Sequence, residues 1–297
     1  MVKAMSVDWA DPRWARRQRW LERFVLALLF GTMLIRVALI WNAWGFEDVN
    51  AYWLAAHRLR DGQPLYLGSL DPDSYLVFRY TPWFAWLWVP LSYLPKELVT
   101  AAWGAILGGA SIAILTGLAQ LRRPAAFALA FIVTPWLLSL VQVGNIQPLM
   151  VATLAFGITR RSGPLWVGIA ASLKGAPILW VLTYLADRDW RRVAASVAIT
   201  AVLIAPLLLF DLSGYTTDPG ASYSLYYYVS PLAWAIGAVA STAVALLLAW
   251  RRSPYVWVAA AVAVMLVPPR THVTYATFLL VAVLGGVRDH GAKSASG

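Results

Sequence analysis

The stretch GFEDVNAYWLAAHRLRDGQPLY, residues 45–66, directly follows the first hydrophobic segment of the chain. Its apolar residues recur with helical spacing, and its polar residues fall mainly on the opposite side. The acidic pair Glu47 and Asp48 stands at the first turn, and Gly62 and Pro64 end the pattern. The stretch therefore predicts a short helix that lies in the membrane interface and begins with carboxylates.

The composition places the chain in a membrane. Of its 297 residues, 60% are hydrophobic and 13% are charged, which is about half the charged share usual for soluble domains. Several apolar runs reach the roughly 18 residues that mark a membrane helix. These features predict an all-α, polytopic helical membrane protein with about 8–11 membrane segments, broken helices and an external juxtamembrane helix.

The net charge of +10 resides mainly at the ends of apolar segments. Five arginines lie between positions 13 and 23, and further arginines stand at 191–192, 251–252 and 288. This positive-inside pattern predicts a cytoplasmic N-terminus and argues against nucleic-acid binding. Contact with anionic membrane lipids is a secondary interpretation. The chain has no cysteine, which excludes disulfides and thiolate chemistry.

The apolar pattern predicts a single membrane domain. We expect residues 1–23 to form a basic cytoplasmic segment, residues 24–288 the transmembrane domain, and residues 289–297 a short tail. The first span is expected at 24–44, and the first external loop, with its juxtamembrane helix, at 45–80.

Two apolar segments leave alternatives open. Residues 81–95 predict either a short tilted span or a re-entrant piece, because they number only 15 and contain three prolines. Residues 163–185 form either one span or two half-helices that turn back at Lys174-Gly175-Ala176-Pro177. The positive-inside rule favours the broken form, because it keeps both flanking basic clusters in the cytoplasm. The same logic places Gly144-Asn145 at the apex of a cavity.

Polar residues within apolar segments need an explanation, because a charge at the bilayer centre costs at least roughly 2.5–3.5 kcal/mol. Lys174 is interpreted as an anion ligand or as a lysine beside a kink that reaches the interface. Arg270 and His272 could bind phosphate or orient a carboxylate, and they could equally be ordinary interfacial residues. Arg79, at a span boundary, has the same two interpretations, as a phosphate ligand or as an ordinary interfacial residue.

Asp48 is the candidate general base. Many of the other acids fall in cytoplasmic or terminal segments, and a carboxylate at a helix start stays ionised and can accept a proton. The alternative is that Asp48 only caps its helix. Asn145 and Gln147 satisfy the backbone of a broken helix, or they contact substrate if the break lines the site. Asp71-Pro72-Asp73 has the form of a metal-binding pair, but ordinary turn chemistry is the favoured explanation, and no metal site is predicted.

Five segments in order resemble a known family. The chain is similar to the bacterial polyprenol-phosphate-mannose-dependent α-mannosyltransferases, within the GT-C glycosyltransferase superfamily, over roughly residues 25–285. The segments that carry the resemblance are Asp48–Tyr52 leading to Gly62–Tyr66, Phe78–Pro82 leading to Pro90–Pro95, Gly144–Gln147, Ser172–Pro177, and Pro268–His272.

The resemblance implies an active site on the non-cytoplasmic face of a bacterial inner membrane. It implies that Asp48 is the general base and that His272 assists the carboxylate or the phosphate. Lys174, Arg270 and Arg79 are then candidates to bind the donor phosphate. We add Asn145, Gln147 and Tyr52 to the residues expected to contact substrate.

The expected activity is inverting transfer of a sugar, mannose by resemblance, from a polyprenyl-phosphate donor to a lipid or glycan hydroxyl. The alternative is a lipid or glycolipid transporter or flippase without transferase activity. No cofactor is expected, although a divalent metal stays open. Membrane lipids are the expected surroundings, and the sequence sets no oligomeric state.

Overall fold

The computed structural model describes residues 46–68, 74, 76–121, 124–215, 222 and 224–296, together with positions 20, 23, 24, 27 and 31. Most of the expected first span at 24–44, most of the basic segment 1–23 and the acidic pair Asp71 and Asp73 lie outside these described residues.

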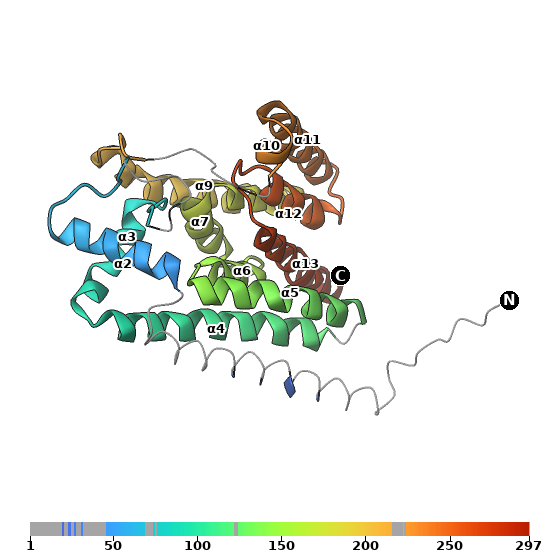
Figure 1. Ribbon diagram of the computed structural model, residues 1–297. Coiled ribbons are helices and arrows are strands. Elements are labelled where there is room, and N and C mark those ends of the chain that lie inside the picture. Colours follow the sequence, from blue (N-terminus) through green and yellow to red (C-terminus); the bar gives the residue numbers. More distant parts are fainter. Residues whose placement is uncertain are drawn as a thin grey trace.

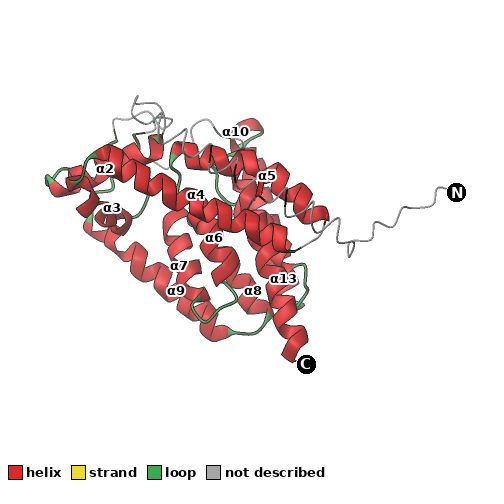
Figure 2. Cartoon of the chain, turned by 90° about the horizontal axis from the view of Figure 1, so that it is seen from below, coloured by secondary structure: helices red, strands yellow, loops and turns green. Residues whose placement is uncertain are grey.

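Within the described ranges, every regular element is a helix (Figure 1), and the view from below contains no strand in those ranges either (Figure 2). The expected all-α polytopic architecture is confirmed. The elements in chain order are α2 Glu47–Arg60, α3 Pro82–Trp88, η1 Pro90–Tyr93, α4 Lys96–Gln120, α5 Pro124–Val143, α6 Gln147–Gly157, α7 Gly163–Lys174, η2 Ala176–Trp180, α8 Val181–Ala186, α9 Trp190–Ile204, η3 Ala205–Leu209, α10 Leu225–Tyr228, α11 Pro231–Trp250, α12 Val256–Leu266, η4 Val273–Phe278 and α13 Leu279–Ser296.

Helix α2 is the helix predicted from residues 45–66. It begins after Phe46, whose backbone is left-handed with φ 58°, and it ends just before Gly62, which has φ 68°. Its apolar face is buried, including Val49 and Tyr52 at 0% exposure. Helix α2 packs mainly against α3, beside it in Figure 1, and the Phe46 N–H donates to the carbonyl of Gln142 at the end of α5.

The segment 163–185 is broken, as the positive-inside rule favours. Helix α7 ends at Lys174, Gly175 adopts φ 68° and ψ −71°, and the chain continues through η2 into α8. Tyr184 near the end of α8 donates a 2.8 Å hydrogen bond to the carbonyl of Ile158, just before α7 begins. The two halves therefore form a hairpin, and Lys174 lies at its turn.

A second break separates α5 from α6. Gly144 has φ 76°, and a Cβ atom there would stand 2.5 Å from Cγ2 of Val49. The Gly144 carbonyl accepts a 2.9 Å hydrogen bond from the indole of Trp103. Only a glycine suits this point, because it needs both positive φ and a close approach to α2.

The segment 81–95 does not form one continuous α-helix. Helix α3 has seven residues, and the 3₁₀ turn η1 follows it. Seven residues rise about 10 Å, whereas a bilayer core is about 30 Å thick. The α-helical part of the segment is thus much shorter than a full span, which favours the re-entrant alternative, and the segment lies against α2.

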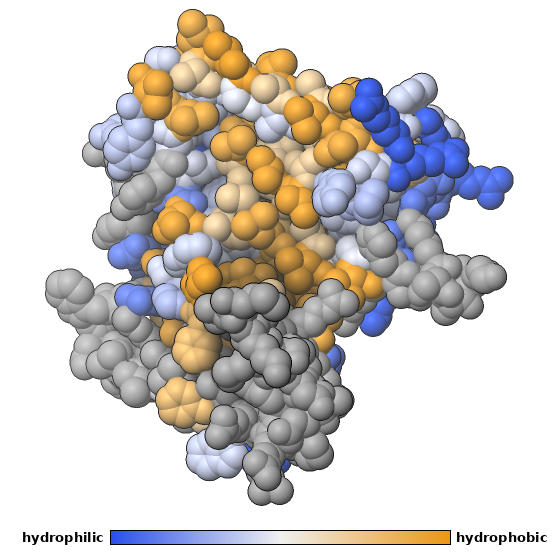
Figure 3. Space-filling model, turned by 90° about the vertical axis from the view of Figure 1, so that its right-hand side faces the viewer, coloured by the Kyte–Doolittle hydropathy of each residue, from blue (hydrophilic) through white to orange (hydrophobic). Residues whose placement is uncertain are grey.

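Three described helices are long and apolar enough to cross a membrane: Lys96–Gln120, Trp190–Leu209 and Pro231–Trp250. Shorter apolar helices of 10–17 residues accompany them. Apolar side chains on α9, η3 and α11 face outward, with Val202, Leu208 and Leu232 at 70%, 88% and 69% exposure. Figure 3 shows a broad hydrophobic area on one face of the molecule. Outward apolar surfaces of this extent suit contact with lipid.

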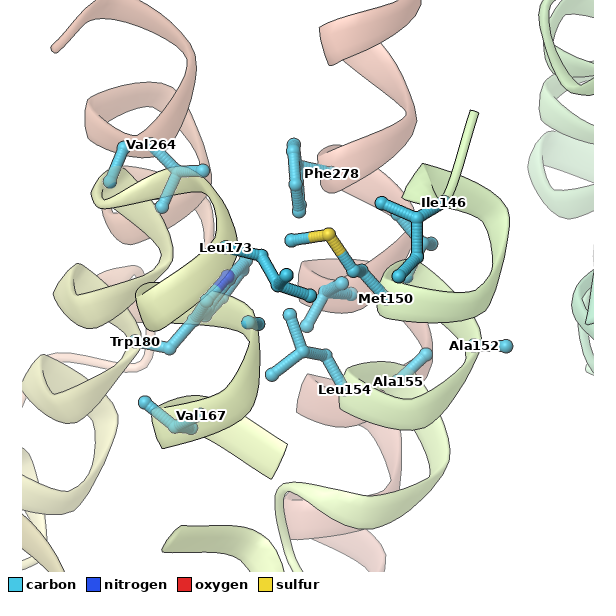
Figure 4. Packing of buried hydrophobic residues seen from close by; sticks show 14 of the residues in the cluster. Ile146, Met150, Ala152, Leu154, Ala155, Val167, Leu173, Trp180, Val264 and Phe278 are labelled. Atoms are coloured by element: carbon cyan, nitrogen blue, oxygen red, sulfur yellow. The ribbon is translucent and has the colours of Figure 1, made fainter. Parts of the chain in front are cut away.

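The core is built around α6. Met150 and Leu154 of α6 pack with Leu173 of α7, Trp180 of η2 and Phe278 of η4 (Figure 4). The core therefore joins the two helix breaks and the start of the last helix, and it fixes their positions relative to one another.

Candidate active site

Asp48 occupies the first turn of α2 but does not cap it. The N-cap residue is Phe46, and no side chain makes the cap hydrogen bond. The Asp48 carboxylate instead accepts a 2.6 Å hydrogen bond from Nδ2 of Asn145, in the break between α5 and α6. The described geometry therefore does not support the capping alternative, because the carboxylate is directed across the bundle.

Asn145 uses both ends of its side-chain amide. While its nitrogen donates to Asp48, its Oδ1 accepts a 2.9 Å hydrogen bond from the backbone N–H of Gln147. Asn145 therefore satisfies the backbone at the first turn of α6, as one of its two expected roles requires, and its amide also holds the candidate base.

Gln147 is 1% exposed and connects three elements. Its Nε2 donates to the carbonyl of Thr274 at 2.8 Å and to Oγ1 of Thr277 at 2.9 Å, both in η4. Its Oε1 accepts a 3.2 Å hydrogen bond from Nζ of Lys174 at the end of α7. The fixed amide thus presents an acceptor to the Lys174 ammonium.

Lys174 is half-buried and has an aromatic neighbour as well. Its Nζ lies 4.8 Å from the ring centroid of Tyr275 in η4, a distance suited to a cation–π interaction. The lysine predicted as an anion ligand is therefore held by Gln147 and Tyr275 in the structure, at the turn of the α7–η2 hairpin.

Tyr52 lies beside this group rather than in it. Its side chain is fully buried, its ring packs against Tyr80, Phe84, Trp88 and Trp103, and its hydroxyl donates to the Tyr80 hydroxyl at 3.1 Å. This placement favours a packing role over the substrate contact expected for Tyr52. Burial, assisted by the charge of Asp48, raises the pKa of Tyr80 to about 12.

The remaining predicted residues lie in the segments before α3 and η4. Arg270 is half-buried in the loop that precedes η4, and His272, the N-cap residue of η4, has an exposed side chain. The His272 carbonyl accepts a 2.8 Å hydrogen bond from the N–H of Tyr275. Arg79 precedes α3, and its carbonyl accepts a 3.3 Å hydrogen bond from the Tyr215 hydroxyl.

The electrostatics of Asp48 reflect this arrangement. Burial raises the pKa of the Asp48 carboxyl above its ordinary value of 3.8, and the neighbouring Glu47 acts in the same direction. The ammonium of Lys174, the Asn145 hydrogen bond and the guanidinium of Arg270 oppose this rise. Cations from α7 and from the segment before η4 therefore favour the ionised form of a carboxylate on α2.

Sequence reasoning missed the contribution of η4. Tyr275, Thr274 and Thr277 are not among the predicted site residues, although they hold Lys174 and Gln147. A signal was present, because positions 274 and 277 are polar within an otherwise apolar run and residues three apart eclipse in a 3₁₀ helix. In the described part of the chain, no group of three or more His, Cys, Asp or Glu side chains comes together to hold a metal.

Comparisons with known proteins bear on this geometry. Residues 78–221 match the model of glycosyltransferase family 87, a range that includes Asn145, Gln147 and Lys174. No solved structure gives a significant match.

Two related proteins carry names that specify a reaction. The chain is 32% identical to the polyprenol-phosphate-mannose-dependent alpha-(1-2)-phosphatidylinositol pentamannoside mannosyltransferase of Mycolicibacterium smegmatis, with 67% of this chain and 52% of the relative covered. It is 29% identical to the polyprenol-phosphate-mannose-dependent alpha-(1-2)-phosphatidylinositol mannoside mannosyltransferase of Mycobacterium tuberculosis, with 68% and 53% covered. The chain thus spans about half the length of these relatives. The resemblance is confirmed: the chain matches the glycosyltransferase family 87 model over residues 78–221 and is related to the polyprenol-phosphate-mannose-dependent mannosyltransferases.

Proposed function

We propose that the protein transfers a mannosyl residue from a polyprenyl-phosphate donor to a hydroxyl of a lipid-linked acceptor, at the non-cytoplasmic face of a bacterial inner membrane. The family match and the names of the two relatives support the donor and the sugar. Both relatives are named for phosphatidylinositol mannoside acceptors, which makes a mannosylated glycolipid the first acceptor to test.

The observation that carries the proposal is that one short segment holds both an acid and a cation from distant parts of the chain. Asn145 holds the carboxylate of Asp48, and Gln147, two residues later, accepts from the ammonium of Lys174. A charge inside a membrane protein is costly, and paired polar groups at the turns of broken helices are typical of substrate sites.

In the proposed reaction, the acceptor oxygen attacks the anomeric carbon of the donor. The bond between the anomeric carbon and the phosphate oxygen breaks, and its electron pair leaves with the polyprenyl phosphate. The acceptor hydroxyl gives its proton to the Asp48 carboxylate as the new glycosidic bond forms. Lys174 and Arg270 stabilise the charge that develops on the leaving phosphate. A single displacement inverts the anomeric configuration.

The test is incubation of purified protein, in detergent or vesicles, with radiolabelled polyprenyl-phosphate mannose and a mannosylated phosphatidylinositol acceptor. We expect label to appear in a larger glycolipid with the anomeric configuration opposite to that of the donor. Movement of labelled lipid between leaflets without a new glycosidic bond would instead identify a flippase and reject the proposal.

A further inference from the structure

The break between α5 and α6 is held rigidly in place. Gly144 is pressed against α2, its carbonyl accepts from Trp103, and the N–H of Asn145 donates to the Leu140 carbonyl at 2.9 Å. The next residue, Ile146, is buried in the core. The backbone from which the side chains of Asn145 and Gln147 project is therefore anchored on several sides.

The two amides of this break have fixed orientations. Oδ1 of Asn145 accepts from the Gln147 N–H, so that its Nδ2 must face Asp48. Nε2 of Gln147 donates to Thr274 and Thr277, so that its Oε1 must face Lys174. Rotating either amide by 180° would place like groups against each other and break these bonds.

We propose that Asn145 and Gln147 are positioning residues, and that this single three-residue segment fixes the Asp48 carboxylate and the Lys174 ammonium in position relative to each other. This inference rests on the proposed function and deepens it. In this inference the two amides orient the base and the phosphate-binding cation, and they do not contact the substrate directly.

Because one segment holds both charged groups, a change in that segment should alter the pKa of the Asp48 carboxyl. The groups that act on this carboxylate are Glu47 on α2, Lys174 on α7 and Arg270 before η4, with the buried phenols of Tyr52 and Tyr80 nearby. Lys174 and the Asn145 hydrogen bond both lower the pKa of Asp48 against the effect of burial. Loosening either amide should therefore raise that pKa.

Two variants test this without relying on turnover. Asn145→Asp keeps an acceptor for the Gln147 N–H but places a second carboxylate against Asp48. Gln147→Met keeps the length of the side chain but removes the acceptor that holds Lys174. We expect the protonation midpoint of Asp48, followed by the infrared carboxyl band with Asp48→Asn as the blank, to rise by about one unit in each variant. The acid limb of transfer activity should shift in the same direction.

The matched control is Tyr184→Phe. It also removes one buried hydrogen bond of 2.8 Å, to Ile158 near the opposite end of α6. We expect it to lower thermal stability and to leave the Asp48 midpoint unchanged. Should Gln147→Met not fold, Thr277→Val removes one of the acceptors of the Gln147 amide and should give a smaller upward shift.

Unchanged midpoints in folded Asn145→Asp and Gln147→Met protein would overturn the inference, and so would an equal shift in Tyr184→Phe. The infrared measurement separates this failure from that of the proposed function. Wild-type protein without transfer activity would reject the mannosyltransferase while the midpoints still decide the positioning role.

Discussion

The side-chain amide of Asn145 donates a 2.6 Å hydrogen bond to the carboxylate of Asp48, which lies 97 positions earlier in the chain. This bond joins helix α2 to the break between α5 and α6. It gives the candidate base a partner that neither the periodicity of its own helix nor its position beside the first span could indicate.

The first prediction concerns the base. Asp48→Asn should reduce mannosyl transfer by about 10²–10⁴-fold, because the amide cannot accept the proton of the acceptor hydroxyl. Initial rates with labelled donor measure the effect. Glu47→Gln is the matched control: Glu47 is the adjacent acid, its side chain is exposed, and its variant should retain transfer. Full transfer by folded Asp48→Asn would remove Asp48 from this role.

The second prediction is a pH dependence. Burial raises the pKa of Asp48 above 3.8, and only the ionised carboxylate can act as base. Transfer should therefore increase with pH along an acid limb whose midpoint lies above 3.8.

The same shift affects stability. The folded state favours the protonated form of Asp48, so the stability that this group contributes is full below the unfolded pKa and is lost as pH rises through the folded pKa. The difference in melting temperature between wild-type and Asp48→Asn protein should therefore change with pH across that window. A difference that stays constant would contradict the prediction.

The third prediction concerns the cation. Lys174→Met should weaken binding of the polyprenyl-phosphate donor about 10–100-fold, because a hydrogen bond to a charged group contributes about 1.5–3 kcal/mol. Titration with polyprenyl phosphate measures it. Lys96→Met makes the same chemical change at an exposed position at the start of α4 and should bind donor normally. Equal affinities for the two variants would show that Lys174 does not contact the phosphate.

The fourth prediction separates backbone strain from packing. Gly175→Ala should destabilise the protein by about 1–3 kcal/mol, since φ 68° and ψ −71° suit only glycine, although a Cβ there meets no atom within 4 Å. Gly109→Ala, within α4, also meets no atom but has ordinary helical backbone, and should stabilise by about 0.5–1 kcal/mol. Thermal unfolding in one detergent compares the two, and the same sign for both would refute the argument from strain.

Local sequence rules correctly predicted the two breaks and the helix that follows Phe46. Gly62 and Pro64 end α2, and Gly144 and Gly175 each adopt the positive φ that interrupts an apolar segment. These features are local, because they follow from the backbone freedom of glycine and from the spacing of apolar residues. The segment 81–95 was ambiguous from its length and its prolines, and its division into α3 and η1 against α2 appears only in the tertiary structure.

Some contacts among the candidate site residues could be anticipated from the sequence, and their functional roles stay predictions. Asp48, Asn145, Gln147 and Lys174 came from the sequence, and the described contacts join them through two hydrogen-bonded pairs. Tyr275 was missed, because an aromatic residue in an apolar run has the same pattern as a core residue. Tyr52 was expected at the substrate, but its full burial among four aromatic rings follows from how α2 meets α3 and α4.

By itself, the sequence determined that this chain is an α-helical membrane protein with glycine breaks and costly polar groups inside apolar segments. Hydropathy, charge distribution and glycine placement are properties of short windows, and they need no knowledge of distant neighbours. Only the tertiary structure decided which amide holds which charge, because Asn145 meets Asp48, and Gln147 meets Lys174, through helices that pack across the bundle. The direction of a side-chain amide depends on all of its hydrogen-bond partners at once, and those partners come from three separate parts of the chain.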